Sequence, residues 1–280
     1  MCCCYRIENS RRTREIIEEM NRSPLVPLWR QGAEVITEYG EVRPTDIVPV
    51  IAPNKSGKRT VFPMKWGFSG KSLIINARTE TAASKPTFRD SWNNRRCIVP
   101  ASWYFEWEHI PAGGGKTRRG DKYKIRSGEE LTMLCGLYRM ENGLPSFVIL
   151  TREPGESTRG IHNRMPLILP EKYADDWIRP DTRPEELLTF ALTEPETKKV
   201  SPEEEETESR IRRIRYFEEI FREALHRPAP PALLAELEAY YTSGEWREDF
   251  EADEAGLLPP DLPRGVLSED GIYNLLEDQG

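Results

Sequence analysis

Histidine and cysteine are scarce in this chain of 280 residues, with three and five copies, and neither follows the spacing of a familiar metal site. Three of the cysteines are adjacent, at positions 2, 3 and 4, so they form no C-x-x-C pair, and no histidines stand as H-x-x-x-H. The odd cysteine count also argues against a complete disulfide framework. The sequence therefore predicts reduced thiols, no metal ion and no organic cofactor.

Long apolar runs are also missing. No stretch approaches the ~18 apolar residues that a membrane-spanning helix needs, and the N-terminal segment MCCCYRIENSRR lacks the apolar core of a signal peptide. We therefore expect a cytoplasmic protein with no membrane partner.

The net charge of −7 is unevenly distributed. Residues 1–202 contain 32 Lys and Arg against 26 Asp and Glu, whereas residues 203–280 contain 8 against 21. A mildly basic front part is compatible with a polyanion such as nucleic acid, although ordinary solvated surface explains the same excess. The charge balance by itself therefore decides little about partners.

Short strands are expected over residues 33–110, where apolar or β-branched runs alternate with Pro, Gly and Asn. The apolar runs 131–138 and 146–151 have the length of strands buried in a closed or two-layered sheet. Helices are expected at three apolar-periodic segments: 11–20 and those beginning near Glu171 and Pro184. The pattern indicates an α+β domain over residues 1–202.

A second domain follows. Pro202 and a run of four glutamates predict an acidic, solvated linker over residues 203–207. Residues 208–280 carry two segments of helical spacing separated by HRPAPP, then a tail rich in Gly and Pro. We expect a small, mainly helical domain there, whose partner the sequence does not identify.

Cys2 can acquire an unusual reactivity. If Met1 is removed, Cys2 carries a free α-amine and a thiol on adjacent carbons, and these groups titrate near ~7.7–8.0 and ~8.5. The amine can condense with an aldehyde to a Schiff base, and the thiol can then close a thiazolidine ring. The alternative is that a cysteine at position 2 has no special role.

A polar cluster follows the apolar run LII at residues 76–81, which read NARTET. Asn76 could donate to an oxyanion or hold an amine, and Arg78 could bind a phosphate. The alternative is a helix start with a cap and an ion pair.

Two further side chains have the chemistry of proton transfer. Glu106 lies within the aromatic run WYFEW, either exposed at a strand end or in an apolar pocket that would raise its pKa. His162, in IHNRMP, is a candidate general acid or base, or else a structural hydrogen-bonding group.

Together these segments resemble one family, the SOS response-associated peptidases (SRAP). The likeness covers about residues 1–202 and rests on motifs that occur in the family's order: MC (1–2), MKWGF (64–68), NARTET (76–81), RRCIVPASWYFEW (95–107), CGLY (135–138), ILT (149–151), IHNRMPLIL (161–169) and VSP (200–202). It implies a barrel-like, mostly antiparallel β-sheet with flanking helices. Residues 208–280 resemble a small bacterial domain of uncharacterised function.

The resemblance implies that the protein shields abasic sites in single-stranded DNA by a covalent crosslink. Cys2 would trap the abasic aldehyde as a thiazolidine, and Asn76 would position its α-amine. Glu106 would shuttle protons during ring opening, Schiff-base formation and crosslink reversal, and His162 would act as an acid or base at the sugar. Some members also release an N-terminal leader by self-cleavage.

By motif position, the expected DNA contacts are Trp66, Arg78 and Arg164, with Pro44 and Thr151 as weaker candidates. A core tryptophan remains the alternative for Trp66. The family resemblance also implies a bacterial cytoplasmic protein associated with the nucleoid.

The chain departs from the family at its start, because MCCCYR stands where MCGR is common. Cys3 replaces a glycine and Cys4 an arginine that could contact DNA. Two other functions stay open: an N-terminal cysteine hydrolase acting on a peptide or amide, and a non-covalent reader of single-stranded DNA.

Overall fold

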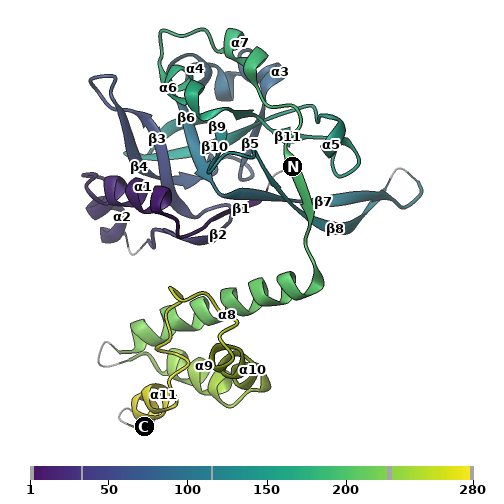
Figure 1. Cartoon of the computed structure of the whole chain (residues 1–280). Helices are drawn as coiled ribbons and strands as arrows, with labels where there is room; N and C mark the ends of the chain where they lie inside the picture. The colour runs from purple at the N-terminus through teal and green to yellow at the C-terminus, as the bar shows by residue number, and fades with distance from the viewer. Residues whose placement is uncertain (1–2, 33, 115, 226–228, 278–280) are drawn as a thin grey trace. The chain divides into compact units, whose positions relative to one another are not determined.

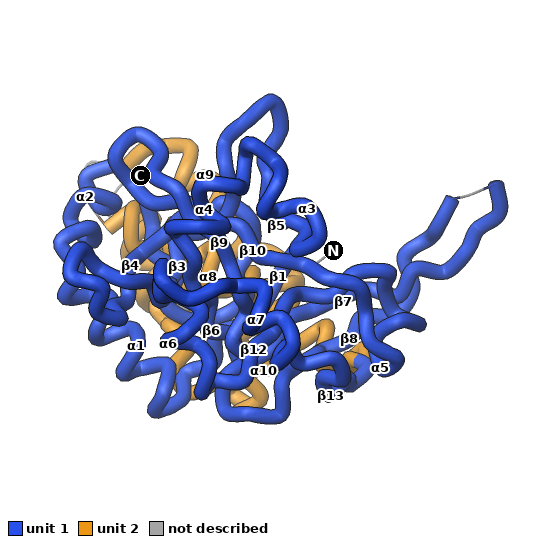
Figure 2. The backbone as a smooth tube through the Cα atoms, turned by 90° about the horizontal axis from the view of Figure 1, so that it is seen from above, with its two compact units in different colours: residues 1–199 blue, residues 200–280 orange. Residues whose placement is uncertain are grey.

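The computed structural model describes residues 3–32, 34–114, 116–225 and 229–277 of the chain, which divides into two compact units, residues 1–199 and 200–280 (Figures 1 and 2). Met1 and Cys2 lie outside the described residues. No helix among the described residues is long and apolar enough to cross a membrane.

The described strands of the first unit form two sheets. The smaller sheet has the order β13-β8-β7-β1-β2. Its members are β1 (Cys4–Ile7), β2 (Gly40–Val42), β7 (Trp103–Pro111), β8 (Thr117–Arg126) and β13 (Glu196–Lys199). The larger sheet has the order β11-β10-β4-β3-β6-β9-β12, with β5 paired to β10. It consists of β3 (Ile47–Pro53), β4 (Arg59–Trp66), β5 (Asn76–Arg78), β6 (Arg96–Ala101), β9 (Thr132–Glu141), β10 (Leu144–Arg152), β11 (Met165–Pro166) and β12 (Ile168–Leu169).

Strand β10 closes the larger sheet into a barrel. It pairs antiparallel with β9 and, on its opposite edge, parallel with β4, so that the path β10-β4-β3-β6-β9 returns to its start. At the closure, an added Cβ on Gly136 of β9 would lie 2.9 Å from both Cys97 Sγ and Val148 O, so only glycine fits without a shift. The expected α+β, barrel-like fold is confirmed.

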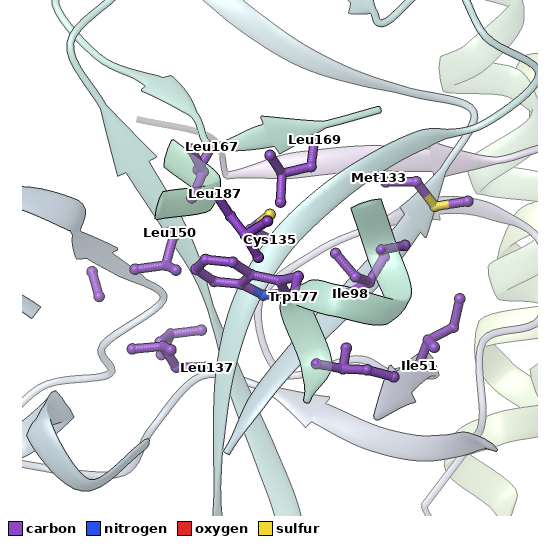
Figure 3. Packing of buried hydrophobic residues seen from close by; sticks show 14 of the residues in the cluster. Ile51, Ile98, Met133, Cys135, Leu137, Leu150, Leu167, Leu169, Trp177 and Leu187 are labelled. Carbon is purple, nitrogen blue, oxygen red and sulfur yellow. The ribbon is translucent and has the colours of Figure 1, made fainter. Parts of the chain in front are cut away.

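Both faces of the barrel strands are buried, which explains their continuous apolar sequences. On β9, Met133, Cys135 and Leu137 pack toward the helices, in a cluster that surrounds Trp177 (Figure 3). The intervening Leu134 faces the second cluster, which also contains Tyr5 and Tyr104 of the smaller sheet. The first unit therefore has one apolar layer under its helices and another between its sheets.

Helices cover the outer face of the barrel. Ser10 caps the first helix through a hydrogen bond from the Thr13 N–H, and that helix buries Ile16, Ile17 and Met20. The three predicted helical segments are confirmed within the full set: α1 (Arg11–Asn21), α2 (Val26–Gln31), α3 (Thr79–Ala82), α4 (Pro86–Asn94), α5 (Glu156–Arg159), η1 (Glu171–Tyr173), α6 (Ala174–Ile178), α7 (Pro184–Leu187) and η2 (Leu188–Phe190).

The second unit is helical, with α8 (Pro202–Ala224), α9 (Pro231–Tyr241), α10 (Gly244–Glu254) and α11 (Glu269–Glu277). Residues 203–207, expected to form a linker, instead form the first turns of α8. The physical reason is a capping box between Ser201 and Glu204, together with acidic residues in the first turn that complement the helix dipole. In its core, the fully buried Asp249 accepts hydrogen bonds from Arg210, Arg213 and Tyr240.

A buried arginine joins the helices of the first unit to its barrel. Arg96 begins β6, is almost fully buried and donates to the backbone oxygens of five residues: Trp92, Asn93, Trp177, Arg179 and Thr182. These oxygens lie at or just beyond the C-terminal ends of α4 and α6, where carbonyls lack partners within the helix.

We predict that Arg96→Met destabilises the first unit by about 3–5 kcal/mol, because several buried carbonyls lose a charged donor. Chemical denaturation followed by tryptophan fluorescence measures this difference. Arg22→Met is the matched control, because the Arg22 side chain is 78% exposed. An equal effect of the two substitutions would contradict the role assigned to Arg96.

Candidate functional site

A cavity of about 580 Å³ lies beside Cys3, the first described residue. Its wall is formed by strands of the smaller sheet and by the segments that adjoin them. The lining residues are Cys3, Cys4, Glu41, Arg43, Pro44, Glu106, Trp107, His109, Thr117, Arg118 and Arg119. The pairing of β1 with β7 explains this grouping, because it sets Cys4 opposite Phe105, the residue before Glu106. Cys2, the predicted nucleophile, lies outside the described residues and directly precedes Cys3.

Glu106 is a buried acid in the cavity wall. Its side chain follows Tyr104 on the strand face that packs between the two sheets, and the residue is only 4% exposed. Its Oε1 accepts a hydrogen bond from the Trp107 N–H at 3.3 Å. Burial raises the pKa of Glu106, as expected for a carboxyl removed from water. Of the two environments considered from sequence, the structure has the pocket.

His162 is also buried, with 6% of its surface exposed. The Arg164 backbone N–H donates to its Nδ1 at 3.0 Å, which favours the neutral tautomer with the proton on Nε2, and the same Nδ1 lies 3.2 Å from Arg164 O. Burial lowers the pKa of His162 to about 4, and therefore the ring is neutral at physiological pH. The ring contacts that of His109, a cavity residue, with 4.0 Å between centroids.

Strand β10 brings two of the predicted motifs together. On one edge it pairs with β5, which begins at Asn76, and on the other with β11, which follows His162. Thr151 stands opposite Arg78 on one side and Pro166 on the other. Asn76 is half-buried and Arg78 is exposed, so Arg78 is accessible to a ligand.

Arg164 joins the same two motifs through an ion pair. Its Nη1 and Nη2 donate to the two carboxylate oxygens of Glu80 at 2.7 and 2.8 Å, and Nη2 also donates to Thr151 O at 2.7 Å. These bonds hold the pKa of Glu80 below its usual range. The helix start with an ion pair, considered as an alternative for residues 76–81, is therefore present at α3.

Three of the predicted DNA contacts are buried within the protein. Trp66 is fully buried beside Tyr5 and Phe147, and its indole N–H donates to Ile75 O, as expected for a core tryptophan. Thr151 is fully buried as well, and the Arg164 guanidinium is occupied by Glu80. Trp66 and Thr151 have no exposed surface, and the Arg164 guanidinium donates to Glu80 and to Thr151 O, so this placement does not support DNA contacts by these three residues. Pro44 lines the cavity and Arg78 is exposed, so these two candidates remain.

The two extra cysteines of the N-terminal segment differ in environment. Cys4 is buried in β1, whereas Cys3 is partly exposed in the cavity wall. A hydrogen bond with Cys4 lowers the pKa of the Cys3 thiol to about 7, although burial opposes this shift. Cys3 is therefore a second ionisable thiol beside the predicted nucleophile.

The sequence analysis did not single out the basic rim of the cavity. The Arg119 guanidinium carbon lies 3.8 Å from the centroid of the Trp107 ring, and Arg118 lies beside it in the same wall. Both arginines belong to the start of β8, in the basic sequence KTRR at the tip of the β7–β8 hairpin. These basic residues are visible in the sequence, but only the pairing of β8 with β7 shows that they lie at the cavity.

Comparison with known proteins identifies the family of the chain. The model of the SOS response associated peptidase (SRAP) family matches residues 1–206, and the chain belongs to this family. Residues 208–280 match a domain of unknown function (DUF4298). The family assignment predicted from the motifs is confirmed.

Similar proteins include two from Bacillus subtilis and one from Escherichia coli. The abasic site processing protein YobE of B. subtilis is 30% identical over 192 residues, which cover 64% of this chain and 83% of YobE. YoqW of B. subtilis, of the same description, is 30% identical over 63% of this chain and 80% of its own length. The abasic site processing protein YedK of E. coli is 29% identical, over 47% of this chain and 60% of YedK.

Solved structures share the fold at lower identity. A protein from Bacteroides thetaiotaomicron superposes with a TM-score of 0.54 at 23% identity, covering 72% of this chain and 93% of that one. A phage-related protein from Bordetella bronchiseptica gives a TM-score of 0.55 at 21% identity, covering 71% and 94%.

The raised pKa of Glu106 predicts a pH-dependent cost in stability. The unfolded chain has a glutamate pKa of about 4.3, so the stability gained from protonated Glu106 is complete below that pH. It is lost as the pH rises through the higher pKa of the folded state. Glu106→Gln, which mimics the neutral acid, should therefore raise Tm at pH 8 and leave it nearly unchanged at pH 4.

Thermal unfolding of both proteins at the two pH values measures this effect, with Glu108→Gln as a control at a less buried position of the same strand. A gain in Tm of equal size at both pH values would show that Glu106 carries no burial penalty.

Proposed function

We propose that this protein captures the aldehyde of abasic sites in single-stranded DNA covalently, through Cys2 freed by removal of Met1. The observation that carries the proposal is the cavity beside Cys3, in which a buried acid, Glu106, lines the wall next to the residue that follows Cys2. The descriptions of the similar proteins as abasic site processing proteins support the same substrate.

The reaction balances with the loss of one water. The α-amine of Cys2 adds to the aldehyde carbon, the hydroxyl of that adduct leaves as water, and the Cys2 thiol then adds across the resulting C=N bond. Two nucleophiles on one residue replace a bimolecular encounter, so ring closure shifts a reversible imine toward adduct. Hydrolysis of the same bonds would reverse the crosslink.

The crosslinking reaction needs two kinds of proton movement, and Glu106 and His162 are suited to them. A buried carboxyl with a raised pKa can donate a proton to the departing hydroxyl and take one back. His162, neutral with its proton on Nε2, can donate a hydrogen bond to a sugar oxygen during ring opening. Asn76 would hold the Cys2 amine, as the family resemblance implies.

Exposed arginines would bind the DNA backbone. Arg78 stays a candidate from the motifs, and Arg118 and Arg119 of the cavity wall join it from the hairpin. Pro44, which also lines the cavity, stays a candidate for an apolar DNA contact. Arg119 is stacked on Trp107, which orders the guanidinium in advance of phosphate binding. Single-strand binding commonly combines cations with aromatic rings in this way.

A peptidase activity is the second candidate, favoured by the description of the family whose model matches the chain. The same Cys2 would attack an amide carbonyl, either in another peptide or in a leader of its own chain. The two functions differ in their product, because the peptidase releases a cleaved peptide and retains no DNA.

We predict that Cys2→Ala abolishes a denaturation-resistant adduct with an abasic-site oligonucleotide. Intact mass spectrometry measures the adduct and the loss of Met1, with an undamaged oligonucleotide as control. Loss of peptide cleavage without any adduct in the wild type would favour the peptidase, and DNA binding unaffected by Cys2→Ala, again with no adduct, would favour a non-covalent reader.

Glu106→Ala and His162→Ala should each slow adduct formation or reversal by roughly 10²–10⁴-fold, because each removes a proton-transfer group. Single-turnover rates on denaturing gels measure the effect. A loss below tenfold in a folded variant would return that residue to a structural role.

Arg78→Ala should weaken binding to undamaged single-stranded DNA and reduce the slope of log K against log salt by about 0.7, the value for one phosphate contact. Fluorescence anisotropy across a salt series measures both quantities. Arg11→Ala is the control, since Arg11 is 88% exposed on α1. Identical salt slopes for wild type and Arg78→Ala would exclude this contact.

A further inference from the structure

His109 lies where the smaller sheet meets the segment that carries His162. An irregularity in the β7–β8 register falls between Trp107 and His109, after which His109 pairs with Arg119. Such bulges re-aim the side chains that follow them. The His109 backbone N–H donates to Ile161 O at 2.9 Å, which ties β7 to the residue before His162.

The two imidazoles contact each other directly. Their ring centroids are 4.0 Å apart and their planes meet at 62°, an edge-to-face arrangement. His162 is buried, whereas His109 is exposed and lines the cavity. The ring of His109 therefore covers part of His162 on the cavity side of the contact.

A proton on Nδ1 of His162 would displace the hydrogen bond from the Arg164 N–H, since a backbone N–H can only donate. Nδ1 also lies 3.2 Å from Arg164 O, and this contact favours the charged ring, so the groups that keep the ring neutral lie elsewhere. Burial is the largest cause that lowers the pKa of His162, followed by the charge of the chain's N-terminus and then by His109 from β7. Among the described residues, the Arg164 side chain also lowers this pKa, but its charge is balanced by Glu80, whereas His109 belongs to no ion pair.

We propose that His109 is a positioning residue for His162, holding its imidazole neutral with the proton on Nε2 by covering the ring and contributing its own charge. Neither the motifs nor the similar proteins assign a role to this residue. The consequence for catalysis rests on the proposed function, because it requires that the Nε2 proton act on the abasic sugar. The electrostatic claim is independent of that function.

The test compares His109→Ala, which removes both the cover and the charge, with His109→Phe, which retains a ring of similar size. NMR titration of the imidazole protons follows His162 directly, because the chain contains only three histidines. In the wild type, we expect His162 to titrate with a pKa of about 4. In His109→Ala this pKa should rise toward the unperturbed value near ~6.5, and in His109→Phe it should rise less.

Crosslinking rates supply the second measurement. We expect the ratio of the His109→Ala rate to the wild-type rate to fall about fivefold or more between pH 7.5 and pH 5.5, because His162 in the variant alone then takes a second proton on Nδ1, which breaks the hydrogen bond from the Arg164 N–H that orients the ring. His109→Phe should show a flatter ratio. Taking ratios removes the titration of the Cys2 amine, which both proteins share.

An unchanged His162 pKa in both variants would overturn the proposal, and so would a wild-type His162 that titrates near 6.5. If His109→Ala does not fold, the wild-type and His109→Phe titrations still decide the matter. A wild type that forms no crosslink, but shows the expected titrations, would refute the proposed function and leave the electrostatic role of His109 intact.

Discussion

Strand β10 is paired on both edges along most of its length, and the site depends on this constraint. It binds β9 and then β11 on one edge, and β4 and then β5 on the other. Pairing with β9 and β4 closes the barrel. Pairing with β5 and β11 sets Asn76–Arg78 beside the segment that follows His162. Because every backbone group in a doubly paired strand has a fixed partner, its neighbours cannot slip without losing hydrogen bonds. Barrel closure and alignment of the site therefore have one cause.

The smaller sheet supplies the remaining half of the site at a cost in stability. Alternation along β7 places Glu106 on the same face as the core residue Tyr104, so the carboxyl is removed from water. An ionised group in this position destabilises the fold, but a carboxyl with a raised pKa keeps its proton to a higher pH than an exposed glutamate does. His162 shows the opposite shift for the same reason, since burial disfavours its charged form. Desolvation thus favours the neutral form of both side chains.

Residue types singled out the candidates Asn76, Glu106 and His162, whose roles stay predictions, but they could not give the burial of each side chain. Helix 11–20 followed from its apolar spacing. Trp66 and Thr151 were expected at the DNA, yet both are fully buried. A tryptophan in a strand looks the same in sequence whether its ring faces solvent or a second sheet. The acidic run 203–207 was expected as a linker because its charge was apparent, whereas its capping box with Ser201 favoured a helix.

By itself, the sequence determined the chemistry available to this protein: a possible 1,2-aminothiol at Cys2, an acid within an aromatic run, and a membership in the SRAP family that several ordered motifs made recognisable. It also determined the local elements, because apolar spacing and caps act over a few residues. Only the tertiary structure decided which residues meet. The contact of His109 with His162, the stacking of Arg119 on Trp107 and the pairing of Arg164 with Glu80 join residues that are distant in sequence. Their proximity depends on strand pairing and register, which no local pattern encodes.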